Sequence, residues 1–353
     1  MLTSVISICL FILLLVGCEP MQQGREVSMN AVPKLGVDVE PNTLLSFPQD
    51  HGAHLAQGIE WWYVTANLEA DDGTEFGVQW TLFRTSVGNT DARSSRWWDG
   101  QLYFAHFAIQ NNQTHKAFEK FARAGQVEIA AAPFVARIDN WYLKGGADQT
   151  FPLNLMAKQG GFSAQLALHN SVMALHGDKG YSQKTMQGHA SYYYSYPFLH
   201  AKGALEFFGK RYKVTGKAWL DREWSSSLID PKHTGWDWFS LQANNADNGA
   251  LMVFCIRNAL QEYDHCSGSH ILSSGEVQHL ADSQISLQPI EHVSLDGKRY
   301  PTQWHLDVTG FDTTIINSVN KDARNQLSIP YWEGRVTSVG GFTAKGYAEL
   351  VGY

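Results

Sequence analysis

The apolar residues of this chain occur in short runs that alternate with polar positions and are separated by turn dipeptides. Runs rich in aromatic and β-branched residues are typical of strands, and here they include Trp61–Val64, Phe76–Phe83, Leu102–Ile109 and Leu251–Ile256. Dipeptides that favour tight turns lie between such runs, namely Asp72-Gly73, Asn248-Gly249 and Asp296-Gly297. No stretch keeps a 3.6-residue period over three turns, so we expect few helices. The pattern predicts an all-β protein, built as a sandwich or a barrel.

The chain also contains an internal repeat. Gly58-Ile59-Glu60-Trp61-Trp62 recurs as Gly235-Trp236-Asp237-Trp238-Phe239, and in both places an Ala-Asn pair, a turn glycine and an apolar strand ending in Arg84 or Arg257 follow. Towards the end of each unit, Ala201-Lys202-Gly203 is matched by Ala344-Lys345-Gly346. The same order of motifs predicts two structural units, at about 58–209 and 235–352. Each is long enough for a barrel, whose closure removes exposed edges.

The N-terminal segment has the pattern of an export signal. The run from Val5 to Gly17 is uncharged and almost wholly apolar. It is shorter than the roughly 20 residues that span a bilayer, but it suits a signal peptide. Leu15-Val16-Gly17-Cys18 resembles the bacterial lipobox, in which the cysteine is lipidated. We therefore expect residues 1–18 to be a lipoprotein signal peptide and Cys18 the lipid anchor; an ordinary cleaved signal or a short anchor helix is the alternative.

This interpretation also predicts where in the cell the protein is located. By the same resemblance, Glu19 after the cysteine implies transport to the outer membrane. We expect an exported protein, held by its N-terminal lipid on the periplasmic face of the outer membrane. Residues 19–41 are polar and mixed, and are expected to form a tether. Cys255 and Cys266 could pair across a hairpin in an oxidising compartment, and two free buried thiols are the alternative.

Length and charge narrow the remaining possibilities. The mature length suits two domains, which we expect at 42–215 and 216–353. A hydrophobic content of 44% and an aromatic content of 12% indicate a well-packed globular protein. A formal net charge of −7 without a Lys/Arg cluster argues against a nucleic-acid partner.

Specific motifs carry a family resemblance. They are Phe47–His54 running into Glu60–Tyr63, then Ala218–Ser225, then Gly346–Tyr353. Together they resemble the AttH/carotenoid 1,2-hydratase family, some of whose relatives are labelled secreted hydrolases. The resemblance covers nearly the whole mature chain. It implies two tandem lipocalin-like (calycin-type) antiparallel β-barrels, with an apolar ligand site in or between them. It also implies cofactor-free addition of water to the end of an acyclic carotenoid.

The resemblance further implies structural pairings and shows departures. Lipocalin-like barrels begin with a Trp strand whose ring packs beneath a later Arg, so Trp61/Arg84 and Trp238/Arg257 are expected to form this brace. In the carotenoid hydratases a His occupies the position of Arg222. A Tyr and an Asp are also implicated there, in the strand that here reads Val253-Phe254-Cys255-Ile256. The absence of that acid argues against carotenoid hydration as such.

The duplication provides a filter for functional residues. Features present in both units are expected to be structural, so Glu60 and Asp237 are expected to pair with Arg84 and Arg257. Features present once are better candidates for function. These are the Asp50–His54 segment, His106, the run Tyr192–Tyr194 with Tyr196, and Asp221–Trp224.

Asp221, Arg222 and Glu223 are the candidate catalytic residues. Hydration of an alkene needs a proton donor, and a carboxylic acid with a pKa raised by burial can serve. In this interpretation Arg222 orients a polar ligand head and Trp224 packs on an apolar tail, both at the seam between the barrels. A guanidinium beside two carboxylates instead favours ionised acids. The alternative is therefore a structural Asp221–Arg222–Glu223 ion network that clamps the inter-barrel connector.

The candidate ligand-binding residues are His54, Trp62, Tyr63, His106, Tyr193 and Trp224. The histidines and the tyrosines around Tyr193 have structural alternatives: loop anchoring for His54 with His51, a satisfied core position for His106, and packing in the barrel wall or interface for the tyrosines. No further ligand accompanies His51 and His54, so no metal is expected. No cofactor is expected, because dinucleotide, Walker and His-Glu-x-x-His motifs are missing. Gly161–Gln165 fails the nucleophile-elbow pattern, which makes a hydrolase the less favoured enzyme.

Two functions remain open for the sequence. The first is an envelope lipoprotein that binds an apolar or amphipathic small molecule and performs hydratase- or isomerase-type acid–base chemistry. The second is a non-catalytic lipocalin-like carrier of a lipid or another apolar molecule. A buried carboxylate without a counter-ion, facing an apolar cavity, would favour the enzyme. A cavity lined only by aromatic and aliphatic side chains would favour the carrier.

Overall fold

The computed structural model describes residues 36–88, 98–147, 149–169 and 171–353. The expected signal peptide, the lipid anchor at Cys18 and most of the expected tether lie outside the described residues. No helix in the described part of the chain is long and apolar enough to span a membrane.

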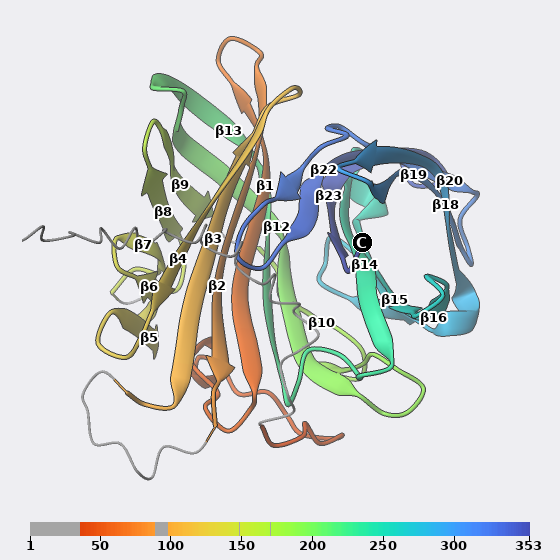
Figure 1. Cartoon of the computed structure of the whole chain (residues 1–353), viewed down its shortest axis with the longest axis horizontal. Coiled ribbons are helices and arrows are strands. Elements are labelled where there is room, and N and C mark those ends of the chain that lie inside the picture. The colour runs from red at the N-terminus through yellow and green to blue at the C-terminus, as the bar shows by residue number, and fades with distance from the viewer. Residues whose placement is uncertain (1–35, 89–97, 148, 170) are drawn as a thin grey trace, which may run out of the picture.

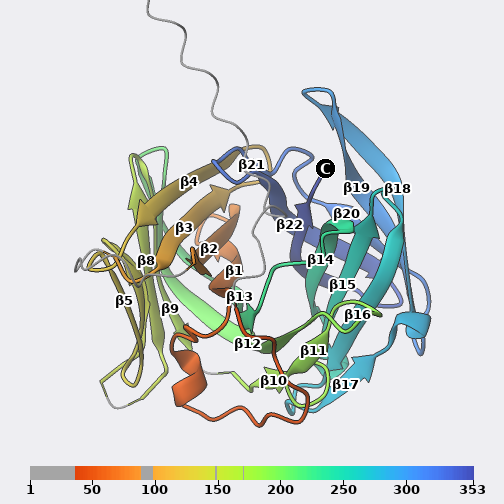
Figure 2. The ribbon, with the colours of Figure 1, turned by 60° about the horizontal axis from the view of Figure 1, so that its bottom comes forward.

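The described residues form two curled antiparallel sheets, one nearly closed into a barrel and the other a half-barrel (Figures 1 and 2). The first sheet contains β1 (Ile59–Ala70), β2 (Glu75–Ser86), β3 (Gln101–Gln110), β4 (His115–Ala122), β5 (Val127–Ala131), β6 (Phe134–Ile138), β7 (Trp141–Lys144), β8 (Leu153–Gln159), β9 (Phe162–His169), β10 (Ala174–Leu175), β11 (Tyr181–Gln183), β12 (Ala190–Phe207) and β13 (Lys210–Ser225). The second contains β14 (His233–Ala243), β15 (Ala250–Asn258), β16 (Tyr263–Ile271), β17 (Val277–Leu280), β18 (Ile285–Leu295), β19 (Lys298–Val308), β20 (Thr314–Ser318), β21 (Arg324–Asn325), β22 (Tyr331–Gly340) and β23 (Ala344–Val351).

Helical structure in the described ranges is limited to short 3-10 turns, at η2 (Gln49–His51), η3 (Ala246–Asn248) and η4 (Asp282–Gln284). The predicted all-β class with two lipocalin-like units is confirmed.

The strand order confirms the duplicated opening. The first sheet runs β4-β3-β2-β1-β13-β12 and the second β17-β16-β15-β14-β23-β22. Thus β14 and β15 take the places of β1 and β2, and β23 takes the place of β13. The matched closings are wrong, because Ala201-Lys202-Gly203 lies on β12 and Ala344-Lys345-Gly346 on β23. A Cβ on either glycine would lie 2.0 Å from a carbonyl oxygen of the neighbouring strand. This close approach selects glycine on any such strand, whatever its place in the order.

The last strand of the first sheet is longer than expected. β13 pairs with β1 from Val214 opposite Ala70 to Ser225 opposite Ile59. The boundary expected after residue 215 therefore falls inside β13, and residues 226–232 connect the sheets. The Asp221–Trp224 segment continues a strand and is not part of the connector, because both of its faces are buried.

Alternation along the shared strands creates three cores. Trp62, Val64 and Ala66 of β1 face the interior of the first sheet, together with Trp80 and Trp141. The second sheet has its own core around Phe239, Trp304 and Trp332. A third cluster lies between the sheets and includes Tyr63, Tyr193, Trp219, Trp236 and Trp238. The seam between the sheets is therefore a hydrophobic core in its own right.

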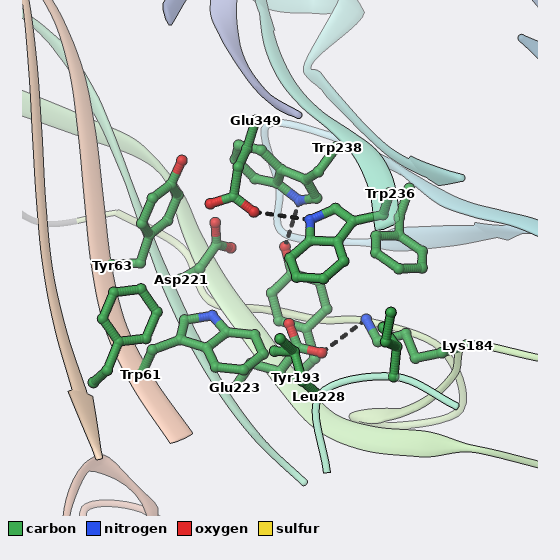
Figure 3. A pocket seen from close by; sticks show the side chains of 13 residues that line it. Trp61, Tyr63, Lys184, Tyr193, Asp221, Glu223, Leu228, Trp236, Trp238 and Glu349 are labelled. Atoms are coloured by element: carbon green, nitrogen blue, oxygen red, sulfur yellow. Dashed lines mark hydrogen bonds and ion pairs between the residues drawn. The ribbon is translucent and has the colours of Figure 1, made fainter. Parts of the chain in front are cut away.

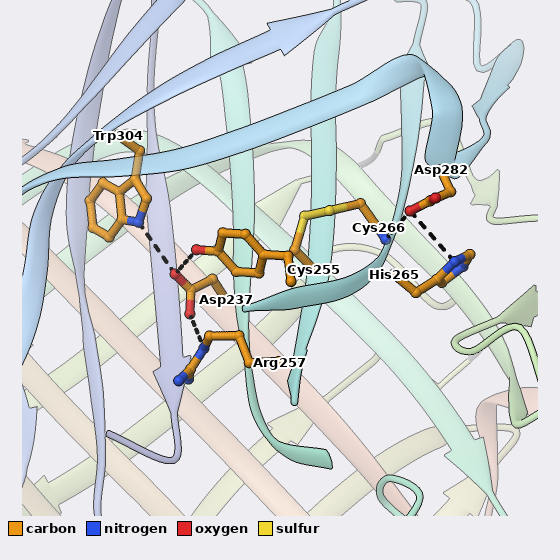
Figure 4. Close-up of a disulfide and its surroundings, with 8 residues drawn as sticks. Asp237, Cys255, Arg257, His265, Cys266, Asp282 and Trp304 are labelled. Atoms are coloured by element: carbon orange, nitrogen blue, oxygen red, sulfur yellow. Dashed lines mark hydrogen bonds and ion pairs between the residues drawn. A yellow bond between two sulfur atoms is a disulfide. The ribbon is translucent and has the colours of Figure 1, made fainter. Parts of the chain in front are cut away.

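Cys255 of β15 and Cys266 of β16 face each other across a hairpin and form a disulfide (Figure 4). The sequence left open a disulfide or two free buried thiols, and the structure has the disulfide. Next to it, Arg257 pairs with the buried Asp237 at 3.1 Å, and Trp304 donates to the same carboxylate.

Candidate active site

A pocket lies at the seam between the two sheets (Figure 3). Most of its wall is aromatic or aliphatic, and three carboxylates and one lysine enter it. Its lining consists of Trp61, Tyr63, Phe83, Lys184, Tyr193, Asp221, Glu223, Leu228, Ile229, Trp236, Trp238, Phe254 and Glu349.

Strand register explains why both sheets contribute the same kinds of residue. Trp61 on β1 lies between Glu223 of β13 and Phe83 of β2. Trp238 on β14 lies between Glu349 of β23 and Phe254 of β15. The two Phe–Trp–Glu rows occupy equivalent strands, so the pocket is built from two related halves.

Asp221 is a buried carboxylate that forms no ion pair with any residue the structure describes. Its Oδ1 accepts hydrogen bonds from the Ser195 hydroxyl and from Trp219 Nε1 at 2.8 Å. No ion pair joins it to a cation within the described ranges. Burial raises the pKa of Asp221 to about 7, although the hydrogen bonds from Ser195 and Trp219 act in the opposite direction.

Glu349 enters the pocket from the second sheet. It accepts a hydrogen bond from Trp236 Nε1 at 2.8 Å, and it too has no ion-pair partner in the part of the chain that is described. Burial raises the pKa of Glu349 to about 7 against the Trp236 hydrogen bond, and the nearby Asp221 and Glu223 add to the rise. Asp221 and Glu349 can therefore each hold or release a proton near neutral pH.

Glu223 differs from these two acids because a cation compensates it. Lys184 Nζ lies 2.8 Å from its Oε1, and the Ser191 hydroxyl donates to the same oxygen at 2.5 Å. The Lys184 ammonium also lies 4.7 Å from the ring centroid of Tyr193 and 4.9 Å from that of Phe254. Glu223 and Lys184 thus form a buried ion pair at one end of the pocket.

Behind the pocket, Tyr63 connects to another acid. Its hydroxyl donates to the buried Glu333 of β22, whose Cα partner on β23 is Glu349. Burial, together with the charge of Glu349, holds the pKa of Glu333 well above its ordinary value. The surroundings of Glu333, behind the wall of the pocket, therefore favour its protonated form.

The aromatic wall suits a reaction that develops positive charge. Trp238 Nε1 donates to the Tyr193 hydroxyl at 3.3 Å, which fixes both rings. Tryptophan faces attract a cation by roughly 0.5–2 kcal/mol. A proton donor, an apolar wall and electron-rich rings are the requirements for protonating an alkene. Among the described residues, no cluster of three or more His, Cys, Asp or Glu side chains could hold a metal ion.

Several predicted site residues lie in this pocket and others do not. Asp221, Glu223, Tyr63 and Tyr193 line it. Arg222 and Trp224 were expected at the seam, and that placement is wrong. Successive strand residues point to opposite faces, so Arg222 and Trp224 point into the first sheet. The expected Asp221–Arg222–Glu223 ion network is wrong for the same reason.

Arg222 instead forms part of a buried network with Glu60. Its Nη2 lies 2.7 Å from Glu60 Oε2, and its guanidinium lies 3.7 Å from the Trp62 ring centroid. Glu60 also pairs with Arg84. The predicted Glu60–Arg84 and Asp237–Arg257 pairs are therefore confirmed.

The predicted brace of Trp61 with Arg84 and of Trp238 with Arg257 is wrong in its partners. Both tryptophans face the seam. In the described structure Arg222 lies over Trp62, and Arg257 lies 3.6 Å from the ring centroid of Tyr353.

The candidate histidines are outside the pocket. The His54 ring stacks on Trp224 with centroids 3.9 Å apart, and its backbone N–H donates to Glu60. His51 Nδ1 lies 2.6 Å from the Tyr194 hydroxyl. Both anchor the loop before β1. His106 Nδ1 lies 2.9 Å from the Tyr331 hydroxyl at the seam, and burial lowers the pKa of His106 to about 3.

The sequence reasoning missed Glu349, Lys184 and the pocket-facing tryptophans Trp61, Trp236 and Trp238. The filter that assigned shared features to folding removed the Trp rows, although equivalent rows from both units form the pocket. The sequence feature that could have identified these tryptophans was the acid-Trp strand that both units share. What the sequence did not provide was the docking of one sheet against the other.

The fold and the pocket define the class of protein: two lipocalin-like sheets in tandem that enclose an acidic, aromatic pocket at their seam. The chain belongs to the AttH-like family, whose sequence model matches residues 38–353, and this confirms the family resemblance.

Solved structures share this fold. An AttH protein from Nitrosomonas europaea is 32% identical with a TM-score of 0.81, covering 90% of this chain and 99% of its own. Kievitone hydratase from Nectria haematococca shares the fold at 14% identity, with a TM-score of 0.67 and coverage of 93% and 96%. CghA with Sch210972 shares it at 12% identity, with a TM-score of 0.56 and coverage of 90% and 94%. Comparison with curated protein sequences gives no significant match.

Proposed function

We propose that this protein is a cofactor-free enzyme that adds water to an alkene of an apolar or amphipathic substrate held in the seam pocket. The observation that carries the proposal is the pair Asp221 and Glu349. Both face an aromatic pocket, and neither has a counter-ion among the described residues. The negative charge of Asp221 raises the pKa of Glu349, which opposes ionisation of both acids together, so we infer a state near neutral pH in which one is protonated and one ionised. That is the state a general acid and a general base require.

Asp221 and Glu349 together donate and accept the protons that the proposed reaction needs. Asp221 donates its proton to one alkene carbon, which forms a C–H bond and leaves a cation at the other carbon. The faces of Trp61 and Trp238 and the Glu349 carboxylate stabilise that cation. A water molecule attacks it, and Glu349 accepts the water's second proton. Transfer of this proton back to Asp221 restores the starting state, so the net change is the addition of one water molecule.

The likeness to a hydratase fold supports the reaction class without specifying the substrate. Kievitone hydratase has the same two-sheet architecture at low identity. The carrier alternative predicts binding without chemistry. The uncompensated carboxylates argue against it, because a carrier of neutral lipids gains nothing from burying two acids.

The test uses protein extracted from its own membranes. Native mass spectrometry identifies any co-purifying ligand, and the protein is then incubated with it and with a panel of acyclic isoprenoids in heavy-oxygen water. We expect a product that carries one heavy oxygen. Asp221→Asn and Glu349→Gln should each slow its formation by about a hundred- to ten-thousand-fold. Glu69→Gln, an exposed change on β1, serves as the control. Bound ligand that is released unchanged at every pH would identify a carrier instead.

We also propose that the protein acts at the cell envelope as a lipoprotein anchored through Cys18. The lipobox-like sequence supports this, and the Cys255–Cys266 disulfide suits an oxidising compartment. Metabolic labelling with a fatty acid should mark the natural protein and not Cys18→Ser. Equal labelling of both would refute the anchor.

A further inference from the structure

A series of buried hydrogen bonds leads from Asp221 towards the second sheet. The Ser195 hydroxyl contacts Asp221 Oδ1, and His176 Nε2 lies 2.6 Å from Ser195 Oγ. His176 Nδ1 lies 2.9 Å from Ser269 Oγ. All four residues are buried. Ser195 belongs to β12 and Ser269 to β16, so the chain of contacts runs from one sheet to the other.

The direction of each hydrogen bond follows from its first member. Trp219 Nε1 can only donate, so Asp221 Oδ1 is an acceptor. The Ser195 hydroxyl then gives its single proton to the same oxygen. Its own oxygen must therefore accept from His176, which places the imidazole proton on Nε2.

The contact between His176 and Ser269, at the far end of this series of hydrogen bonds, agrees with this tautomer. Burial and the charge of Lys184 hold the pKa of His176 well below its ordinary value, so the ring is neutral and has one N–H. With that proton on Nε2, Nδ1 accepts from the Ser269 hydroxyl. Every member of the chain then donates and accepts without conflict.

The local fold holds the imidazole in place. The His176 ring stacks on Tyr193 with centroids 4.0 Å apart, and its backbone N–H donates to the Tyr193 carbonyl at 3.0 Å. Gly177 follows with a φ of +66°, and a Cβ there would lie 2.1 Å from the Tyr181 carbonyl oxygen. Glycine is therefore required at the turn that presents His176 to Ser195.

We propose that His176 is a positioning residue for Asp221: its Nε2–H tautomer, acting through Ser195, keeps Oδ1 as an acceptor and leaves Oδ2 to carry the acid proton. The statement that Asp221 uses this proton as an acid in a reaction rests on the proposed function. If His176 carried its proton on Nδ1 instead, Ser195 would donate to Nε2 and could no longer donate to Asp221. Asp221 Oδ1 would then keep the hydrogen bond from Trp219 and lose the one from Ser195, so the tautomer of His176 decides whether this oxygen has one of these donors or both.

The first experiment needs no substrate. Nitrogen NMR of protein labelled in its histidine rings, with His176 assigned by its loss in His176→Phe, reports which ring nitrogen is protonated. We expect a pH-independent Nε2–H form for His176 in the natural protein. Ser195→Ala removes the hydroxyl that selects this form and should yield a mixture of tautomers. An Nδ1–H form in the natural protein would overturn the proposal.

Infrared difference spectroscopy, with Asp221→Asn as the reference, follows the protonated Asp221 carboxyl. His176→Phe keeps the ring stacked on Tyr193 and removes both nitrogens, so the Asp221 carbonyl band should shift. His176→Gln can still donate to Ser195 and should restore the band. His106→Phe, which removes another buried seam histidine, is the matched control and should leave it unchanged. An unshifted band in a folded His176→Phe protein would reduce His176 to a packing role.

Turnover separates this inference from the proposed function. If the protein is a hydratase, His176→Phe should lower kcat about five- to tenfold, the loss expected for one hydrogen bond, with little change in KM. His176→Gln should recover most of that loss. If no turnover is found with any variant, the hydratase proposal fails, while the NMR and infrared results still decide the role of His176. Equal kcat values for His176→Phe and the natural protein would contradict the inference alone.

Discussion

Glu60 and Asp221 are both fully buried carboxylates on the same pair of strands, β1 and β13, and they face opposite sides of the sheet. Burial would raise the pKa of Glu60, but Arg222, the hydrogen bond from His54 and Arg84 hold it well below the ordinary value. No described residue supplies such a cation to Asp221, and burial raises the pKa of Asp221 to about 7. The comparison teaches that burial does not decide the role of an acid in this protein. The position of the guanidinium groups does.

The largest expected effect is on the Glu60 side of the comparison. Glu60→Gln leaves Arg84 and Arg222 buried without a counter-charge, and we expect it to reduce the free energy of unfolding by about 3–5 kcal/mol at neutral pH. The folded pKa of Glu60 is depressed, so its contribution is present above its unfolded pKa and is lost as the pH falls. Urea unfolding at several pH values measures the difference. A loss below about 1 kcal/mol would mean that the network contributes little.

For Asp221, the acid at the seam, we expect substitution to change the free energy of unfolding in the opposite direction. The pKa of Asp221 is raised in the folded state, so its ionisation costs stability as the pH rises from its unfolded pKa to about 7. Asp221→Asn should therefore raise the free energy of unfolding by about 2–4 kcal/mol at pH values above 7, and by much less near pH 4. Thermal unfolding of the two proteins across this range measures the gain. Destabilisation at high pH would show that Asp221, like Glu60, is structural.

The smallest expected effect concerns ligand charge. Geranyltrimethylammonium, geraniol and geranate share an apolar chain and differ in the charge of the head group. Lys184 already compensates Glu223, so Asp221 and Glu349 give the pocket a net negative charge above pH 7. We therefore expect the cation to bind about tenfold more tightly than the alcohol there, and the anion most weakly. Tryptophan fluorescence measures binding. The preference should fade below pH 6 and disappear in the Asp221→Asn/Glu349→Gln double variant; a preference for the anion would assign the control of selectivity to Lys184.

Part of this comparison was predictable from the sequence. The alternating strands and the repeated acid-Trp opening predicted two sheets and the pairing of Glu60 with Arg84. The alternation also contained the information that Arg222 faces away from Asp221 and Glu223, but the adjacency of the three charges suggested a network instead. Trp238 belongs to the repeated acid-Trp opening, but its place with Glu349 in the pocket of Asp221 arises only when the two sheets dock. Lys184 reaches Glu223 from the segment after β11, and no local pattern marks that approach.

The two Phe–Trp–Glu rows have a consequence for the orientation of whatever enters between them. Two identical subunits meeting at such a seam would have to place a lysine beside both glutamates or beside neither, and their cavity would read the same from each end. In a single chain the two halves of the seam can differ in sequence. Here Glu223 has Lys184 beside it, whereas the partner of Glu349 among the described residues is the indole N–H of Trp236. The cavity is therefore polarised: one end is an ion pair and the other a proton-exchanging acid, so an elongated guest has a preferred head and tail.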